Sequence, residues 1–229
     1  MTKKDFKYIE EHKHVRYQTE ELSEFQIEKR ALDFYNFLDK RRSVREFSEK
    51  PIPREVIENI VKTASTAPSG AHKQPWTFCI VENQDLKSKI RVAAEEEEKI
   101  SYEGRMSETW LKDLKKFGTN HLKPFLEKAP YLIIVFKKPY DLDKNGDKHQ
   151  NYSVTASVGI ACGMLITAIH NAGLVTLTHT PSPMKFLTEI LERPSNERPY
   201  LLLPVGYPAK DVFVPSIERK GLDEMAVFY

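Results

Sequence analysis

Cysteine is scarce in this sequence, which contains only Cys79 and Cys162 among its 229 residues. Both lie inside apolar segments, and neither belongs to a CxxC pair or has a histidine at metal-ligand spacing. A disulfide framework or a zinc site is therefore not expected, and two buried thiols are typical of a reducing cytoplasm. We predict no bound metal and a cytoplasmic location.

Long apolar runs and an excess of one charge are also missing. The most apolar stretch, Ile160–Ile169, is shorter than the ~18 residues of a membrane span, and residues 1–6 lack the apolar segment of a signal peptide. The 35 Lys and Arg residues against 33 Asp and Glu residues leave a net charge of +2. Such a balance gives no electrostatic reason to bind nucleic acid or an anionic membrane. We expect neither partner.

The hydrophobic fraction of 40% and the aromatic fraction of 10% are sufficient for a core. Without repeats or a long linker, the chain is predicted to form an N-terminal arm over 1–30 and one domain over 31–229. Hydrophobic periodicity and β-branched runs predict an α+β fold, an α/β sandwich with helices flanking a sheet. The predicted helices are Glu28–Lys40, Arg54–Ala67 and Asn151–Asn171, with a hydrophilic helical region over Asp85–Lys128. The predicted strands are Trp76–Val81, Pro130–Phe136, Val175–Thr180 and Tyr200–Val205.

Three arginines, Arg41, Arg42 and Arg45, fall within five residues at the end of a predicted helix. The planar, permanently charged guanidinium matches the oxygens of a phosphate, so the cluster is a candidate phosphate site. Taken alone, the triplet is more often a basic helix end that offsets the helix dipole.

A turn of small residues, Pro68–Ala71, allows a flat ligand to approach the backbone, and Gln74-Pro75-Trp76 then leads into a strand. Together these two segments resemble the flavin-binding elements of the nitroreductase family. The family pattern Arg-Arg-Ser-x-Arg-x-Phe corresponds to Arg41–Phe47, and Ala-Pro-Ser-x-x-x-x-Gln-Pro-Trp corresponds to Ala67–Trp76. One departure is His72, where many members carry Asn.

Glu98 and Tyr102 are four residues apart on one predicted helical face, and Lys123 follows further along. A carboxylate, a phenol and an ammonium together match the groups of a zwitterionic amino acid: Glu98 would bind its ammonium, and Tyr102 and Lys123 its carboxylate. A solvated acidic helix face over Glu95–Glu98 and a surface lysine are the structural alternatives.

With Ala71-His72 and Thr178–Pro181, this set resembles the iodotyrosine deiodinases, the reductive dehalogenase branch of the nitroreductase superfamily. The resemblance extends from Leu32 to the C-terminus and includes Leu202–Pro208 and Arg219–Asp223. It implies an FMN-dependent oxidoreductase that converts 3-iodo-, bromo- or chlorotyrosine to tyrosine and halide by stepwise electron transfer. It also implies a central mixed sheet in an intertwined homodimer, with the flavins at the interface.

The resemblance assigns roles to individual residues. Thr180 is the catalytic residue, near flavin N5, and Ala71 offers a backbone N–H to the substrate phenolate. The implied FMN contacts are Arg41, Arg42, Ser43, Arg45, Thr178, His179, Thr180 and Arg219, with Pro68, Ser69 and Gly70 from the partner subunit. The implied substrate contacts are Ala71, Glu98, Tyr102 and Lys123.

Residues 95–123 are predicted to be a substrate lid, because closing it on empty space would leave Glu98 and Lys123 desolvated without partners. Two other functions remain open. One is a general nitro- or quinone-reductase that uses NAD(P)H directly, and the other is a non-catalytic flavin- or halotyrosine-binding protein. For the dehalogenase, NAD(P)H or a separate reductase is the expected electron donor.

Overall fold

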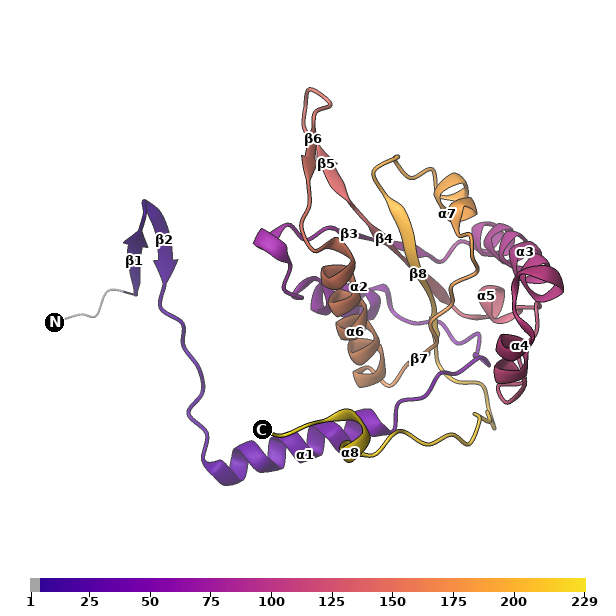
Figure 1. The fold of residues 1–229 in the computed structure, drawn as a ribbon, viewed down its shortest axis with the longest axis horizontal. Helices are drawn as coiled ribbons and strands as arrows, with labels where there is room; N and C mark the ends of the chain where they lie inside the picture. The colour runs from indigo at the N-terminus through magenta and orange to yellow at the C-terminus, as the bar shows by residue number, and fades with distance from the viewer. Residues whose placement is uncertain (1–4) are drawn as a thin grey trace. The chain divides into compact units, whose positions relative to one another are not determined.

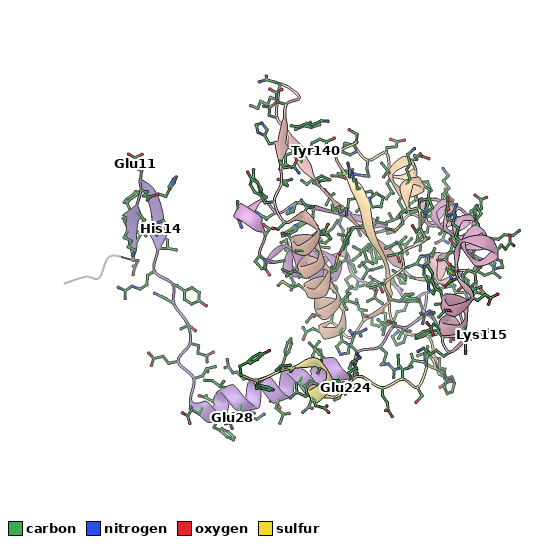
Figure 2. All side chains as sticks on the ribbon, viewed as in Figure 1. Glu11, His14, Glu28, Lys115, Tyr140 and Glu224 are labelled. Carbon is green, nitrogen blue, oxygen red and sulfur yellow. The ribbon has the colours of Figure 1, made fainter. Side chains whose placement is uncertain are left out.

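The computed structural model describes residues 5–229 and divides at Lys40 into two compact units (Figure 1). In the first unit, strands β1 (Phe6–Ile9) and β2 (His12–Val15) form an antiparallel hairpin that carries Glu11 and His14 (Figure 2). Helix α1 (Glu24–Asp39) follows, starting earlier than the predicted Glu28 because Ser23 and Gln26 form a capping box. The unit boundary lies further along the chain than the expected boundary at residue 30.

The second unit, Arg41–Tyr229, is built on a four-stranded sheet with the order β3-β4-β8-β7. These strands are β3 (Trp76–Val81), β4 (Tyr131–Lys137), β8 (Arg198–Gly206) and β7 (Val175–Thr176), and each pairs antiparallel with its neighbour. Ser43 adds an isolated parallel bridge to Thr176 at the β7 edge, so the pairing is mixed.

Helices cover both faces of this sheet (Figure 1). Side chains of β4 alternate between the faces, as the two-residue period of a strand requires. Ile133 and Val135 pack with α2 (Arg54–Ser65) and α6 (Val154–Asn171). Leu132 and Ile134 pack on the other side, with α3 (Gln84–Ile100), α5 (Phe125–Lys128) and α7 (Lys185–Ile190). This arrangement confirms the predicted helix-flanked sheet.

Helix α6 is long and apolar enough, by length and composition, to cross a membrane, although the stretch Ile160–Ile169 alone is too short. Polar residues such as Ser157 interrupt the apolar run, but the helix continues through them. Val158, Leu165 and Ile169 are fully buried in the core beside α2, and this burial accounts for the apolar residues on that side of the helix.

Two sequence predictions need correction. The helical region over 85–128 is divided, because α3 ends in a π-helical turn (Ser101–Arg105) before α4 (Glu108–Lys115) and α5. The strand predicted over Val175–Thr180 ends at Thr176, since the chain leaves the ladder there and pairs with β8 again only at His179. The remaining short elements are a 3₁₀ turn (Gly70–His72), β5 (Tyr140–Leu142), β6 (Lys148–Gln150) and α8 (Leu222–Met225).

Candidate active site

The arginine segment is held at the β7 edge of the sheet. The Val44 N–H donates to the Thr176 carbonyl at 3.2 Å, and Phe47 forms an isolated bridge with Pro208. The side chains of Val44 and Phe47 are buried, which leaves Arg45 between them only partly covered. Packing of the two apolar residues therefore anchors the segment that carries the arginines.

Four arginines come together around one cavity of about 180 Å³. Arg42 donates to the carbonyl of Pro215, and Arg219 donates to the carbonyl of Arg41 at 3.1 Å, so the two segments hold each other. Burial, followed by the positive charges of Arg219 and Arg42, lowers the pKa of Arg41. The cavity is lined by Arg41, Arg42, Ser43, Arg45, Phe117, Pro215, Ile217, Glu218 and Arg219. Such a concentration of guanidinium groups suits a dianionic phosphate, so this donor set fits the phosphate of FMN.

A second cavity, of about 440 Å³, lies beside the first and shares Arg45 with it. It brings together residues that the sequence places far apart. They are Arg45, Glu98, Ser101, Tyr102, Met106, Trp110, Leu114, Thr119, Lys123, Phe125, Leu177, Thr178, His179, Thr180, Ser182 and Met184. The three proposed amino-acid ligands and the three proposed flavin contacts of residues 178–180 thus line one space.

Glu98 and Lys123 face each other in this cavity. The Lys123 Nζ lies 3.4 Å from the Glu98 Oε2, and the two side chains are only 4% and 12% exposed. Lys123 also donates to the Thr119 Oγ1 and to the Asn120 carbonyl. Burial lowers the pKa of Lys123, and the charge of Glu98 opposes that effect. The expectation that both charges would lack partners without substrate is wrong, because each is the partner of the other.

Tyr102 lies on the π-helical turn, one turn after Glu98. Its ring centroid is 5.5 Å from the Lys123 Nζ. Burial raises the pKa of Tyr102, so its hydroxyl stays protonated at neutral pH and is able to donate a hydrogen bond.

His179 is buried between β8 and Glu98. Its backbone N–H donates to the Leu202 carbonyl at 2.9 Å, and its Nδ1 lies 3.9 Å from the Glu98 Oε1. Burial, together with the charges of Lys123 and Arg45, lowers the pKa of His179 to about 3, so the imidazole is neutral. The Nε2 atom has no hydrogen-bond partner among the described residues.

Thr178 and Thr180 lie on either side of His179 and are exposed. The extended backbone explains this alternation, because successive side chains point to opposite faces. Both threonines line the second cavity, where Thr180 was predicted to act.

The Pro68–Ala71 turn is not among the described residues that line either cavity. It packs elsewhere, since the Gly70 N–H donates to the Ser157 Oγ at 3.4 Å and a Cβ on Gly70 would lie 3.1 Å from the Tyr152 carbonyl oxygen. Ala71 has a φ of 49°, in the left-handed region. One chain alone therefore does not bring this turn to the arginines.

Comparison with known proteins agrees with this geometry. The nitroreductase family model matches residues 38–207. The iodotyrosine deiodinase of Haliscomenobacter hydrossis is 62% identical over 200 residues, which cover 87% of this chain and 90% of that protein. Iodotyrosine deiodinase 1 of Homo sapiens is 48% identical, covering 93% of this chain and 74% of that protein. The chain belongs to the iodotyrosine deiodinase branch of the nitroreductase family.

A solved structure supports the same assignment at the level of the fold. The crystal structure of oxidized iodotyrosine deiodinase bound to FMN and 3-iodo-L-tyrosine matches with a TM-score of 0.74 and 32% identity, covering 85% of this chain and 100% of that chain. A BluB-like flavoprotein from Clostridium difficile, at 21% identity and a TM-score of 0.66, shares the fold alone.

Sequence reasoning missed part of the cavity wall. The apolar residues Met106, Trp110, Leu114 and Met184 line the second cavity and lie beside the polar ligands. Trp110 and Leu114 are one helical turn apart on helix α4, and that spacing was the signal in the sequence. Within residues 5–229 no group of three or more His, Cys, Asp or Glu side chains is placed to bind a metal.

Proposed function

We propose that this protein reductively dehalogenates halotyrosines, using FMN, to give tyrosine and halide. The observation that carries the proposal is the cavity in which Glu98, Tyr102 and Lys123 lie together and which Arg45 connects to the arginine cavity. FMN, when bound, supplies the electrons of the reduction.

The arginine cavity would hold the phosphate end of FMN. An FMN phosphate carries about two negative charges, and Arg41, Arg42 and Arg219 provide matching charge from two segments of the chain. Arg45, which borders both cavities, is placed to stabilise negative charge between the phosphate site and the substrate site.

The second cavity would hold the amino-acid end of the substrate. Glu98 binds the ammonium, whereas Lys123 and the Tyr102 hydroxyl bind the carboxylate. Substrate binding exchanges the Glu98–Lys123 ion pair for two pairs with the ligand, so neither buried charge loses its partner. A nitroaromatic compound lacks both groups and leaves that ion pair unchanged.

The halogenated ring must accept two electrons and one proton. The carbon–halogen bond breaks, the halide leaves with the bonding pair, and a carbon–hydrogen bond forms. A halogen lowers the phenol pKa below the usual ~10, and the backbone N–H of Ala71 would bind the resulting phenolate. The Thr180 hydroxyl would lie near flavin N5. With a pKa of about 3, His179 carries no acidic imidazolium proton at neutral pH.

The proposal includes a homodimer in which Pro68, Ser69 and Gly70 complete the partner's flavin site. Three features support it. The turn lines neither cavity of its own chain, every residue of α1 retains solvent exposure, and large apolar residues of the C-terminal segment are exposed. These last residues are Phe213, Val227, Phe228 and Tyr229. Such surfaces favour association.

We further propose a cytoplasmic location and NAD(P)H or a separate reductase as electron donor. The location rests on the thiols, because the chain has only two cysteines and both are free.

Titration of the purified yellow protein tests the proposed function. The flavin absorbance should change on adding 3-iodotyrosine at far lower concentrations than on adding 2-iodophenol, which has the ring without the zwitterion. Turnover of nitroaromatics with NAD(P)H, without any response to iodotyrosine, would instead indicate a general reductase. Binding of iodotyrosine without iodide release after reduction would indicate a non-catalytic binding protein.

A further inference from the structure

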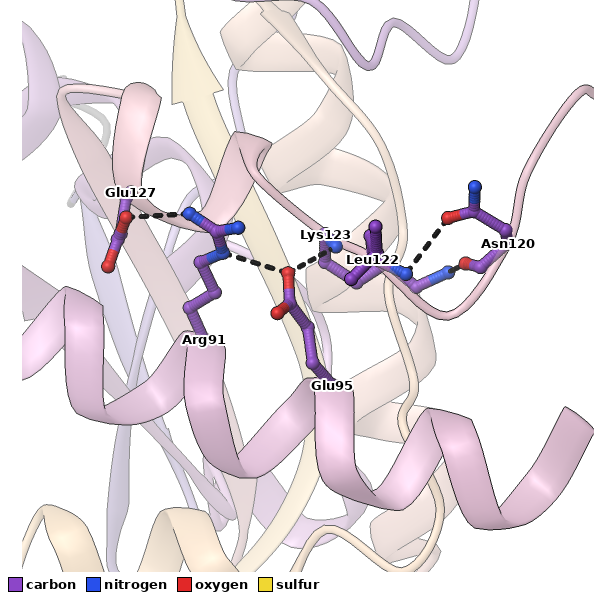
Figure 3. Close-up of polar contacts among 6 residues, drawn as sticks. All are labelled: Arg91, Glu95, Asn120, Leu122, Lys123 and Glu127. Carbon is purple, nitrogen blue, oxygen red and sulfur yellow. Dashed lines mark hydrogen bonds and ion pairs between the residues drawn. The ribbon is translucent and has the colours of Figure 1, made fainter.

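Lys123 is held at its backbone as well as at its side chain. Its backbone N–H donates to the Oε1 of Glu95 at 2.6 Å (Figure 3). The same oxygen accepts from the Nε of Arg91 at 2.8 Å, and the Nη1 of Arg91 lies 2.8 Å from the Oε2 of Glu127. All three charged side chains are partly buried, so water screens this network less than it screens a surface ion pair.

The network adjoins two of the proposed substrate ligands, Glu98 and Lys123. Glu95 and Glu98 are three residues apart on α3 and therefore share a face of the helix. Glu95 accepts a hydrogen bond from the main chain of Lys123, while Glu98 pairs with its ammonium. One helical face thus determines both where the Lys123 backbone lies and where its side chain points.

The hydrogen bond to Glu95 also gives a backbone N–H of the loop its acceptor. Lys123 ends the segment after α4 and precedes α5, so its N–H has no carbonyl partner of a continuing helix. Leu122, the residue before it, is held in the same way, because its N–H donates to the Asn120 Oδ1 at 2.9 Å (Figure 3). Without these acceptors, two adjacent backbone donors of a partly buried loop would lose their partners.

We propose that Glu95 is a positioning residue for substrate recognition. It fixes the main chain of Lys123, so that when the substrate ammonium takes the place of Lys123 at Glu98, only the lysine side chain moves to reach the substrate carboxylate. Arg91 orients Glu95, and Glu127 orients Arg91. Glu95 itself does not touch the substrate. This inference rests on the proposed halotyrosine site and assigns a residue that determines its selectivity.

The test compares Glu95→Ala, Glu95→Gln and Glu96→Ala in the FMN-bound protein. Glu95→Ala removes the acceptor for the Lys123 N–H, and we expect the dissociation constant for 3-iodotyrosine to rise about tenfold or more. Affinities for 2-iodophenol and FMN should stay unchanged, and the rate of iodide release at saturating iodotyrosine should fall much less than the affinity. Glu95→Gln keeps an acceptor oxygen but loses the ion pair with Arg91, so it should restore part of the affinity.

Glu96→Ala is the matched control, because Glu96 is the next residue on α3 and is exposed. It should behave like the unmodified protein. If Glu95→Gln and Glu95→Ala leave iodotyrosine affinity unchanged while Glu98→Gln lowers it, the positioning role is overturned and the proposed function stands. If both Glu95 variants weaken iodotyrosine and 2-iodophenol equally, Glu95 acts on the fold and the positioning role is again overturned. If Glu98→Gln also changes the affinities for iodotyrosine and 2-iodophenol to the same extent, the proposed amino-acid site itself is wrong.

Discussion

At the scale of single residues, Glu98 is the side chain proposed to distinguish an amino acid from a simple phenol. Its side chain is 12% exposed and forms an ion pair with Lys123. A charge-assisted hydrogen bond contributes roughly 1.5–3 kcal/mol, so Glu98→Gln should raise the dissociation constant of 3-iodotyrosine about ten- to a hundredfold. Affinity for 2-iodophenol should hardly change, as flavin absorbance titrations would reveal. Equal weakening of both ligands would place the role of Glu98 in folding or flavin binding.

Arg45 borders both cavities, and its replacement should affect flavin first. Burial lowers the pKa of Arg45, because the partly covered guanidinium has lost some of its hydration, and an anionic ligand would offset that cost. Arg45→Ala should weaken FMN binding by about 1–3 kcal/mol, measured by fluorescence on flavin release. Lys50→Ala is the control, since Lys50 is exposed and lies over the ring of Tyr207 rather than in a cavity. Unchanged FMN affinity in Arg45→Ala would contradict the assignment of the arginine cavity.

His179 should make the folded protein sensitive to acid. Its pKa is about 3 in the folded state against an ordinary value of 6.5, so the unfolded chain takes up the proton first as the pH falls. The contribution is fully present above pH ~6.5 and is lost progressively below it, amounting to about 2 kcal/mol between pH 7 and pH 5. Urea unfolding at the two pH values measures it. In His179→Gln this part of the pH dependence should disappear; if the difference between the two pH values persists unchanged, other groups cause it.

At the scale of elements, the segment from α3 through α4 to Lys123 carries most of the proposed substrate ligands. Hydrogen exchange across residues 95–123 should slow on adding 3-iodotyrosine but not on adding nitrobenzene, because only the former exchanges the Glu98–Lys123 pair for new contacts. The exposed Trp110 on α4 is expected to gain protection with it. Equal protection by both compounds would indicate a general reductase lid.

The sequence predicted that Glu98, Tyr102 and Lys123 lie near one another, but not how they are held. The four-residue spacing of Glu98 and Tyr102 was sufficient to place both on one face, and the structure brings them into one cavity. The π-helical turn at Tyr102 was not predictable, because a period of 3.6 residues assumes a regular helix. The ion pair of Glu98 with Lys123 was missed as well, since it depends on a loop closure that local periodicity does not describe.

At the scale of the whole molecule, the sheet and its flanking helices followed directly from the sequence. Strand β4 is apolar from Leu132 to Phe136 because both of its faces are covered, and that run is a strong local signal. The early end of β7 at Thr176 gave no such signal, since Leu177–Thr180 has the same β-branched composition as a strand but pairs only at His179. In the proposed homodimer a second chain would bring the Pro68–Ala71 turn to the arginines, and local sequence patterns do not describe such an arrangement.

The proposed homodimer, with a flavin site shared between subunits, predicts that two differently defective subunits complement each other. Arg45→Ala damages the arginine side of a site, whereas Gly70→Val damages the turn, where even a Cβ meets the Tyr152 backbone at 3.1 Å. Mixed by refolding or coexpression, the two variants should recover about a quarter of the unmodified activity, because in half of the dimers one of two sites is intact. Two inactive parents that give no activity when mixed, despite light scattering that shows mixed dimers, would exclude a shared site.

The proposed function requires that reduced flavin in this site deliver electrons to a halotyrosine held by its amino-acid groups. The most direct measurement is a single anaerobic turnover, in which protein with FMN fully reduced by dithionite, freed of excess reductant, is mixed with 3-iodotyrosine. We expect flavin oxidation to be accompanied by one iodide and one tyrosine per FMN oxidised. With 2-iodophenol at the same concentration, we expect far less flavin oxidation and far less iodide. Flavin that stays reduced, or is oxidised without iodide release, would contradict the proposed function.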